Sequence, residues 1–314
     1  MDKSRHNIFD CAIVGAGPAG LSAAVYMGRM RRSVIVIDNK EGRSNWHQLN
    51  RNYLGFPDGI HATALRDVGR EQAERYGALF LDARVQDVRM EGEDRRRLFC
   101  LSTGAGYDEI VARTLILATG VVDSFPEFEG SDDCIGRSIF WCIICDGFET
   151  IGKNVLVLGS GHRAAALALQ LRVFTDTVSL APWNAPLNIE PNRLLDLREH
   201  GIRVYTSLAH SFNCGSNKQL ASVTLEDLTE LSLDLAFVTQ RIQPTTQLAE
   251  KLGVIQDEDG FIVTDVEQCT NVEGVYAAGD VTRLFNHQVT SAVHEGGMAA
   301  AAANYYLYED WQKE

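Results

Sequence analysis

Gly15-Ala16-Gly17-Pro18-Ala19-Gly20 sets the architecture of this chain. A short apolar strand, Cys11-Ala12-Ile13-Val14, runs into this glycine-rich loop, and the following residues 21–27 have a helical pattern. In such a loop one glycine allows a tight turn, one lets a pyrophosphate approach the backbone and one lets the helix pack closely on the strand. The free N–H groups at the start of the helix then bind the phosphates.

A second strand and an acidic residue continue the same pattern. Ser33-Val34-Ile35-Val36-Ile37 is an apolar strand that ends in Asp38, at the interval after the loop that suits an acid holding a ribose 2′-OH. A plain βαβ turn is the alternative, but loop, helix, strand and acid occur here in order. The sequence therefore predicts an α/β fold with a dinucleotide site that includes Gly15, Gly17, Pro18, Ala19, Gly20 and Asp38.

The same theme appears again in the middle of the chain. Asn154-Val155-Leu156-Val157-Leu158 is a strand, Gly159-Ser160-Gly161-His162-Arg163-Ala164 is a loop, and residues 165–171 form a helical pattern. This predicts a second Rossmann-type unit, of the kind that binds NAD(P)H. Its next strand, Thr177-Val178-Ser179-Leu180, should be followed by an acid for NAD or by arginines for NADP.

The residues after that strand provide neither. Ala181-Pro182-Trp183-Asn184-Ala185-Pro186 contains no charged residue, and its two prolines lack backbone donors. A 2′-phosphate without a cation would lose its charge-assisted hydrogen bonds. Arg163 lies within the loop and does not rebuild the site alone. NADPH is therefore doubtful as the physiological electron donor.

Two cysteines stand close together between the two nucleotide motifs. Trp141-Cys142-Ile143-Ile144-Cys145-Asp146-Gly147 can close a small disulfide ring, with Asp146 beside it as a candidate proton carrier. Half of a zinc site and an incidental core pair are the alternatives. Zinc usually needs a second paired motif, and the other cysteines stand singly, so we expect no metal site. These are Cys11, Cys100, Cys134, Cys214 and Cys269.

Composition is that of an ordinary soluble globular protein. The 314 residues are 45% hydrophobic and 23% charged, enough for two domains, and the net charge of −13 disfavours nucleic acid as a partner. No apolar stretch is long enough to cross a membrane, and the first residues show no signal-peptide pattern. An odd number of cysteines, seven, does not suggest a secreted disulfide framework. We expect a cytoplasmic enzyme.

Two further strand ends bear on the identity of the dinucleotide. Thr114-Leu115-Ile116-Leu117 ends in Ala118-Thr119-Gly120, and residues 271–278 end in Gly279-Asp280. Each is by itself consistent with a tight strand exit. Together with the first loop they resemble the FAD-binding set of flavin disulfide reductases, in which the aspartate bonds the ribityl chain and the glycine admits it. The resemblance implies a discontinuous FAD domain, 1–120 and 245–314, with an inserted NAD(P)H-type domain, 121–244, that carries the cysteine pair.

Taken together, these motifs resemble the low-molecular-weight thioredoxin reductase family over nearly the whole chain. Asn52-Tyr53-Leu54-Gly55-Phe56-Pro57-Asp58-Gly59-Ile60 and His287-Gln288-Val289-Thr290-Ser291-Ala292 add to the match. The resemblance implies two three-layer Rossmann-like domains, bound FAD and a homodimer. It assigns Cys145 to face the flavin, Cys142 to attack the partner disulfide and Asp146 to transfer protons. It places Gln288, with His287 and Asn52 nearby, at the flavin, although a polar residue at a turn is the alternative for Gln288 and Asn52.

The chain also departs from the family pattern. The basic cluster after the second Rossmann strand is missing, and His287 stands where the family has arginine. Two isoleucines lie between the cysteines and Trp141 precedes them, so we expect apolar surroundings that disfavour a thiolate and exclude water. These departures are similar to NADPH-independent branches of the family, which include ferredoxin-dependent thioredoxin reductases and dithiol oxidases.

The expected function is a flavin enzyme that passes electrons between FAD and a partner disulfide through Cys142 and Cys145. Thioredoxin is the expected partner, and ferredoxin is one donor that would replace NADPH. A dithiol oxidase that uses oxygen, or a flavin redox sensor without turnover, are the alternatives. The aromatic tail that ends in Trp311 suggests that Trp311 or a tyrosine stacks on a flavin across the dimer; packing of the helix end on the dimer partner is the alternative.

Overall fold

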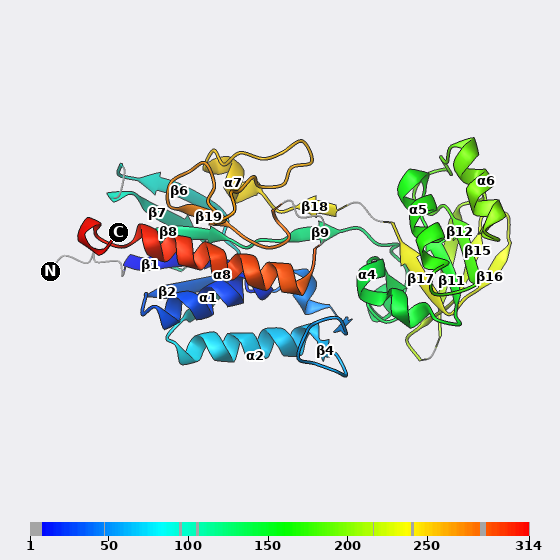
Figure 1. Ribbon diagram of the computed structural model, residues 1–314, viewed down its shortest axis with the longest axis horizontal. Coiled ribbons are helices and arrows are strands. Elements are labelled where there is room, and N and C mark those ends of the chain that lie inside the picture. Colours follow the sequence, from blue (N-terminus) through cyan, green and yellow to red (C-terminus); the bar gives the residue numbers. More distant parts are fainter. Residues whose placement is uncertain are drawn as a thin grey trace. The chain divides into compact units, whose positions relative to one another are not determined.

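The structure is a computed structural model that describes residues 8–46, 48–93, 96–104, 107–215, 217–239, 242–282 and 287–313. The chain divides into two compact units (Figure 1). Unit 1 comprises Met1–Asn45, Thr63–Val122 and Gln243–Glu314, and unit 2 comprises Trp46–Ala62 and Asp123–Ile242.

Unit 1 is built on a seven-stranded sheet whose order is β5-β2-β1-β8-β7-β6, with β19 also beside β8. The parallel strands are β5 (Leu79–Asp82), β2 (Val34–Asp38), β1 (Ile8–Val14), β8 (Ile110–Leu117) and β19 (Val275–Ala277). An antiparallel hairpin of β7 (Leu98–Ser102) and β6 (Asp87–Glu91) extends the sheet beyond β8.

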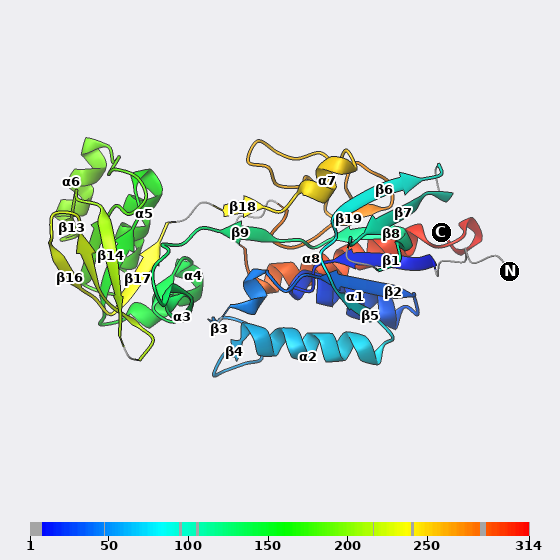
Figure 2. The ribbon, with the colours of Figure 1, turned by 180° about the vertical axis from the view of Figure 1, so that it is seen from behind.

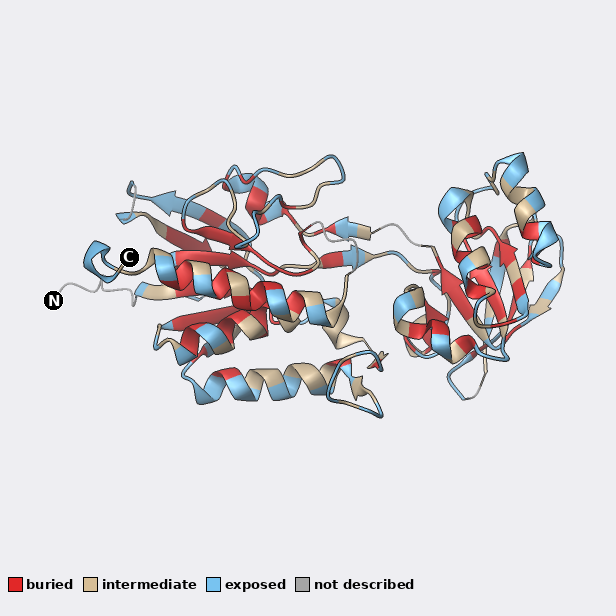
Figure 3. Ribbon diagram, in the orientation of Figure 1, coloured by how far each residue is buried: buried red, intermediate tan, exposed pale blue. Residues whose placement is uncertain are grey.

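Both faces of this sheet are covered, as the alternation along β1 requires. Cys11 and Ile13 pack into a cluster with α1 (Pro18–Arg29) and α8 (Val289–Tyr306). Ala12 and Val14 point the other way, into a cluster with β6, β7 and α7 (Gln247–Lys251). Figure 3 shows the resulting band of buried residues along the central strands. A further helix, α2 (Ala62–Arg75), precedes β5.

Unit 2 has a five-stranded parallel sheet between helices and a second, smaller sheet. Its strands, in spatial order, are β10 (Ile139–Phe140), β17 (Leu235–Val238), β11 (Asn154–Leu158), β12 (Thr177–Ala181) and β13 (Arg203–Val204). One face packs on α4 (Ile143–Asp146), α5 (Gly161–Leu171) and α6 (Pro191–Glu199). The other face packs on the antiparallel sheet of β14 (Ala209–Cys214), β15 (Leu220–Leu225) and β16 (Glu230–Ser232), which Figure 2 shows from behind.

Two short strands carry the chain from one unit to the other. β9 (Val121–Asp123) and β18 (Ile242–Pro244) pair with each other, close to the crossings that the expected boundaries at residues 120/121 and 244/245 imply. The remaining elements are short: η1 (Arg43–Asn45), β3 (Leu49–Asn50), β4 (Ile60–His61), α3 (Ser131–Cys134), η3 (Gly147–Thr150) and η4 (Asp310–Gln312).

One segment groups differently from the boundaries expected from the sequence. Those boundaries leave residues 46–62 in the FAD domain, whereas Trp46–Ala62 clusters with unit 2. The physical reason lies in its side chains: Trp46 packs on Phe125 and Trp141, and Arg51 pairs with Glu149. Apart from this segment, the units divide at residues 122 and 242, close to the expected crossings.

The predicted α/β class is confirmed by the parallel sheets and their covering helices. Both loop helices begin earlier than their apolar periodicity indicates, α1 at Pro18 and α5 at Gly161. Proline suits the first helical position because its fixed φ is helical and its missing N–H would be unpaired there anyway. None of the helices that the structure describes is both long and apolar enough to cross a bilayer.

Candidate active site

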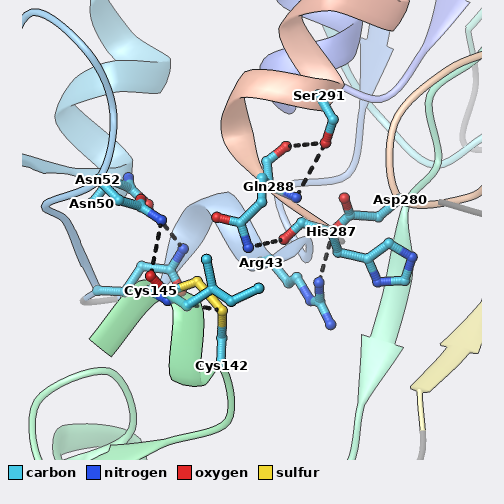
Figure 4. The surroundings of a disulfide bond; sticks show 11 residues. Arg43, Asn50, Asn52, Cys142, Cys145, Asp280, His287, Gln288 and Ser291 are labelled. Carbon is cyan, nitrogen blue, oxygen red and sulfur yellow. Dashed lines mark hydrogen bonds and ion pairs between the residues drawn. A yellow bond between two sulfur atoms is a disulfide. The ribbon is translucent and has the colours of Figure 1, made fainter. Parts of the chain in front are cut away.

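The cysteine pair lies on a one-turn helix. Cys142 is the N-cap of α4, and a disulfide joins it to Cys145 with a Cα–Cα distance of 5.3 Å (Figure 4). The backbone N–H of Cys145 donates a hydrogen bond to Cys142 Sγ over 3.2 Å. Such a bond stabilises negative charge on that sulfur once the disulfide opens. The backbone therefore favours Cys142 as the thiolate of the pair.

The two isoleucines between the cysteines have different surroundings. Ile143 packs into the core of unit 2, whereas Ile144 is exposed. The expectation of an apolar, water-excluding environment on all sides thus holds for Ile143 only, because a single helical turn cannot bury two consecutive residues on one face. Both cysteines are partly exposed.

A cluster of three aromatic rings precedes the pair. Trp46, Phe125 and Trp141 lie with each pair of ring centroids 5.2 Å apart, all in edge-to-face arrangements. Edge-to-face contacts of this kind stabilise a cluster beyond the area it buries. They attach the segment that begins at Trp46 and the linker residue Phe125 to the residue before Cys142.

Asp146 is placed as the sequence predicts for a proton carrier. It follows Cys145 directly and its side chain is buried, with 8% of the residue exposed. Burial raises the pKa of the Asp146 carboxyl to about 7, while the positive charge of Arg51 lowers it and the negative charge of Glu149 raises it. A carboxyl with this pKa can both give and take a proton near neutral pH. Arg51 and Glu149, which lie 3.2 Å apart in an ion pair and act on the charge of Asp146, were not singled out from the sequence.

The Arg51–Glu149 pair should set the pH dependence of the proton step. In Glu149→Gln the repulsion on the Asp146 carboxylate is lost, so its pKa falls and the protonated, proton-donating form disappears at a lower pH. In Arg51→Gln the attraction is lost, so the pKa of Asp146 rises and the alkaline limb of the pH–rate profile moves to higher pH. We expect shifts of roughly half a pH unit in opposite directions, measured as kcat/KM for disulfide reduction against pH.

The double variant Arg51→Gln/Glu149→Gln should return close to the wild-type profile, because the two charges cancel. Lys153→Gln serves as the matched control, since Lys153 is a nearby exposed cation that does not contribute to the pKa of Asp146. Shifts in the same direction for both single variants would contradict this assignment.

Asn52 contacts the cysteine turn. Its Nδ2 donates to the carbonyl oxygen of Ile144 over 3.5 Å, within unit 2 (Figure 4). Asn50, two residues earlier, is buried and donates to the carbonyl of Ile60 across the β3–β4 hairpin. The predicted role of Asn52 at the flavin remains a prediction.

In unit 1 the first glycine-rich loop has the shape that a pyrophosphate requires. Gly15 adopts φ +107°, and a Cβ there would lie 2.3 Å from the carbonyl oxygen of Ala118. A Cβ on Gly20 would lie 1.9 Å from the oxygen of Gly15, whereas a Cβ on Gly17 would meet open space. The first turn of α1 contains no acid and no capping side chain occupies its N-terminus. Gly17 thus leaves room for a phosphate, and the fit to a dinucleotide is good.

Asp38 and the strand ends around this loop are tied together. Asp38 Oδ1 accepts a hydrogen bond from Ala16 N over 3.0 Å, so one carboxylate oxygen shapes the loop itself. Thr119 donates to the carbonyl of Thr245 over 2.6 Å, and Gly120 adopts φ +66°. Ala118, Thr119 and Gly120 therefore close the end of β8 beside the loop.

The Gly279-Asp280 turn is held by a buried carboxylate that the sequence analysis missed. Glu295 Oε2 accepts hydrogen bonds from Gly279 N at 2.6 Å and from Thr282 Oγ1 at 3.1 Å. Burial raises the pKa of the Glu295 carboxyl. Glu295 is the only acidic residue of α8, in a helix otherwise rich in alanine and glycine, and that isolation was the available signal. Arg43 binds Asp280 at 2.7 Å (Figure 4).

His287 and Gln288 lie at the start of α8. Gln288 is the N-cap and exchanges hydrogen bonds with Ser291, and its Nε2 donates to the carbonyl of His287 (Figure 4). The His287 ring lies 5.6 Å from that of Phe261. Both residues belong to the unit that holds the dinucleotide loop.

The second glycine-rich loop, in unit 2, is hydrogen-bonded through Ser160 to the segment that follows β12. Ser160 Oγ donates to the carbonyl of Pro186 over 2.7 Å and accepts from Asn188 N over 2.9 Å. A Cβ on Gly161 would lie 3.6 Å from the carbonyl oxygen of Asn188. The segment after β12 thus supplies one carbonyl acceptor and one N–H donor to Ser160, while the N-terminus of α5, like that of α1, has no capping side chain and no acid in its first turn. Among the described residues no cluster of side chains could hold a metal ion.

A dinucleotide-type glycine loop in one unit and a cystine followed by a buried carboxyl group in the other are the parts that a flavin-dependent disulfide oxidoreductase requires. Residues 9–301 match the family described as pyridine nucleotide-disulphide oxidoreductase. The thioredoxin reductase of Treponema pallidum is 32% identical over 95% of this chain and 97% of its own length. The chain therefore belongs to the pyridine nucleotide-disulphide oxidoreductase family and, within it, to the low-molecular-weight thioredoxin reductases.

Solved structures agree with this assignment. The crystal structure of HlmI has a TM-score of 0.87 and 30% identity, covering 96% of this chain and 93% of that one. The atypical thioredoxin reductase TRi from Desulfovibrio vulgaris Hildenborough is 36% identical over 95% of this chain and 97% of that one, with a TM-score of 0.52. The two Rossmann-like domains and the flavin cofactor predicted from the sequence are confirmed, and the cofactor is FAD.

Proposed function

We propose that this enzyme reduces the disulfide of a thioredoxin-type protein with electrons that a donor other than NADPH supplies, ferredoxin being the candidate. The observation that carries the donor proposal is the segment after β12, which provides neither an acid nor an arginine and is bonded to Ser160 of the loop. The thioredoxin partner is inferred from the name of the Treponema pallidum relative.

The cysteine turn performs the exchange in this proposal. When bound, FAD would supply the two electrons that reduce the Cys142–Cys145 disulfide, with Cys145 as the sulfur that the family resemblance assigns to receive them. Cys142, whose sulfur accepts the N–H of Cys145, attacks the partner disulfide as a thiolate and forms a mixed disulfide. Cys145 then attacks Cys142, the intramolecular disulfide closes and the partner leaves as a dithiol. Asp146 holds the proton that the departing thiolate takes.

Two observations in unit 2 speak against NADPH as donor. No acid or arginine comes directly after β12, so neither a ribose nor a 2′-phosphate finds its usual partner. The Ser160 hydroxyl donates to the carbonyl oxygen of Pro186, so this donor of the loop is used within the chain rather than for a phosphate.

Anaerobic mixing tests the donor directly. The oxidised protein is combined in turn with NADPH, NADH and reduced ferredoxin, and flavin bleaching is followed by absorbance. We expect ferredoxin to bleach the flavin and both nicotinamides to fail on the timescale of turnover. Rapid bleaching by NADPH would refute this assignment of unit 2, while leaving the disulfide chemistry intact.

The aromatic cluster of Trp46, Phe125 and Trp141 favours one second candidate, a dithiol oxidase for small apolar dithiols. Aromatic rings beside an attacking cysteine suit a small ring-containing substrate better than a large protein surface. Oxygen consumption with small dithiols, combined with no activity toward thioredoxin, would select the oxidase. Absence of turnover with any dithiol or disulfide would instead leave a flavin redox sensor.

We propose a cytoplasmic homodimer, with the aromatic tail as part of the interface. Trp311 is 83% exposed and lies five residues beyond the end of α8, whose 18 residues span about 27 Å. In this proposal the exposed Trp311 packs against a partner subunit. Light scattering of Trp311→Ala tests it: retention of the dimer and of the flavin spectrum would remove Trp311 from both roles.

A further inference from the structure

Unit 2 holds a second pair of cysteines that the sequence presents as unrelated. Cys134, at the end of α3, and Cys214, at the end of β14, are joined in a disulfide although 80 residues separate them. In the sequence neither of these two cysteines belongs to a short cysteine motif, so nothing there indicated that they pair. The other three cysteines, Cys11, Cys100 and Cys269, are free thiols.

This disulfide lies on the segment that leads to the active cysteines. After Cys134 the chain turns, enters β10 and reaches Trp141 and Cys142 within eight residues. Backbone N–H groups of Arg137 and Ser138 donate to the carbonyl of Cys134, so the turn is built on the bonded residue. The Cys134–Cys214 bond therefore anchors the N-terminal side of the strand that positions Cys142.

The two linked segments also hold together without the covalent bond. Three other contacts join the same parts of the fold: Phe128 stacks on Phe212 with ring centroids 4.9 Å apart, Lys218 pairs with Asp133 at 3.1 Å, and Leu220 N donates to Ser138 Oγ at 2.8 Å. These contacts keep Cys134 and Cys214 neighbours when they are reduced. The pair can therefore open and close again at high effective concentration, as a reversible redox pair requires.

The two sulfurs differ in access. Cys134 is fully buried in the core between the two sheets of unit 2, with 0% exposed, whereas Cys214 is partly exposed at the strand end. A thiolate from solvent thus reaches Cys214 Sγ first. This asymmetry gives the exchange a defined order.

We propose that Cys134 and Cys214 form a second thiol–disulfide site, which dithiols open and which controls the rigidity of the segment that positions Cys142. One thiol of the dithiol attacks Cys214 Sγ, the Cys134–Cys214 bond breaks and the Cys134 thiolate leaves and takes a proton. The second thiol of the reagent then closes its own disulfide, and Cys214 leaves as a thiol. Two electrons and two protons pass from the dithiol to the pair, and no other oxidant or reductant is needed.

The site differs from the active pair in what it does. The proposed function produces a dithiol, and dithiols are the class of reagent that reduces the Cys134–Cys214 disulfide. The product would therefore make the segment that positions Cys142 less rigid. Only this physiological role rests on the proposed function. The existence of the pair and its effect on β10 are properties of unit 2 alone.

The test uses the full chain carrying Cys142→Ala and Cys145→Ala, so that one disulfide remains. Before dithiothreitol treatment, alkylation of the denatured protein and mass spectrometry should label Cys11, Cys100 and Cys269 only. After treatment Cys134 and Cys214 should be labelled as well. The melting temperature should fall by about 5–10 °C on treatment, and hydrogen exchange in residues 131–141 should become roughly tenfold faster.

Alanine variants separate the bond from the loss of a buried side chain. Adding Cys134→Ala to that protein should lower the melting temperature and abolish its response to dithiothreitol, and Cys214→Ala should do the same. Cys11→Ala, which removes an equally buried free thiol, should leave the response intact. Labelling of Cys134 and Cys214 before treatment, or an unchanged exchange rate in residues 131–141 after it, would overturn the proposal.

Discussion

Replacing Cys142 or Cys145 with serine should abolish disulfide reduction, by roughly 10³-fold or more, while FAD remains bound. Serine keeps the size of the side chain but its hydroxyl is not ionised near neutral pH and forms no disulfide. Without Cys142 no sulfur attacks the partner. Without Cys145 the mixed disulfide on Cys142 has no internal thiol to resolve it.

FAD should be retained because the cysteines and the flavin loop belong to different units. Gly15, Gly17 and Asp280 lie in unit 1, and Cys142 and Cys145 lie in unit 2. The measurement is turnover with a protein disulfide, alongside the flavin content from absorbance. Cys269→Ser is the matched control, since Cys269 is a partly exposed free thiol. Turnover near the wild-type rate in either active-pair variant would contradict the assigned chemistry.

Gly17→Val should yield a folded protein that has lost FAD, with affinity weakened at least roughly 100-fold. The backbone of Gly17 is at φ −74°, which any residue adopts, and a Cβ there meets no protein atom within 4 Å. The added methyl groups would occupy the space that the pyrophosphate needs. The apoprotein should keep its far-ultraviolet circular dichroism and a cooperative melting transition.

Gly20→Val provides the contrast within the same loop. A Cβ at Gly20 would lie 1.9 Å from the carbonyl oxygen of Gly15, so this variant should fail to fold rather than merely lose the cofactor. The two outcomes distinguish a glycine that leaves room for a ligand from one that leaves room for the backbone of the loop itself. Binding of FAD by Gly17→Val with wild-type affinity would show that the dinucleotide lies elsewhere.

Features that depend on local sequence were predictable. The loop Gly15–Gly20, the strand ending in Asp38 and the turn Cys142–Cys145 are each determined by neighbours within a few residues, and periodicity and glycine spacing report such neighbours directly. The division into two units was indicated by the repeated strand–loop–helix pattern. The functional assignment of Asp146 came from its position beside Cys145, and its burial supplied the physical reason.

Features that depend on long-range pairing were not predictable. Arg51 meets Glu149, Glu295 holds Gly279, and Cys134 bonds Cys214, and each of these pairs is brought together by the tertiary fold. The sequence offered one sign, the isolated acidic residue Glu295 in α8, but no pattern in it specifies the partners of these residues, because they are common types at irregular spacing. The grouping of Trp46–Ala62 with unit 2 arises in the same way, from side chains that find partners after β9.

The second glycine-rich loop, in unit 2, lies between these two cases. The sequence showed that the ligand-binding acid or arginine was missing after β12, but not where that segment lies. In the structure its Pro186 carbonyl accepts a hydrogen bond from Ser160 in the loop. That contact joins residues 26 positions apart, and no local pattern specifies it.

The most direct test of the account is to ask whether electrons placed on the bound flavin reach Cys142 and Cys145. The chain carrying Cys134→Ala and Cys214→Ala is photoreduced anaerobically without added thiols, then denatured and alkylated, and the labelled cysteines are identified by mass spectrometry. We predict that Cys142 and Cys145 become labelled in proportion to the electrons supplied. A bleached flavin with Cys142 and Cys145 still joined in their disulfide would contradict the account.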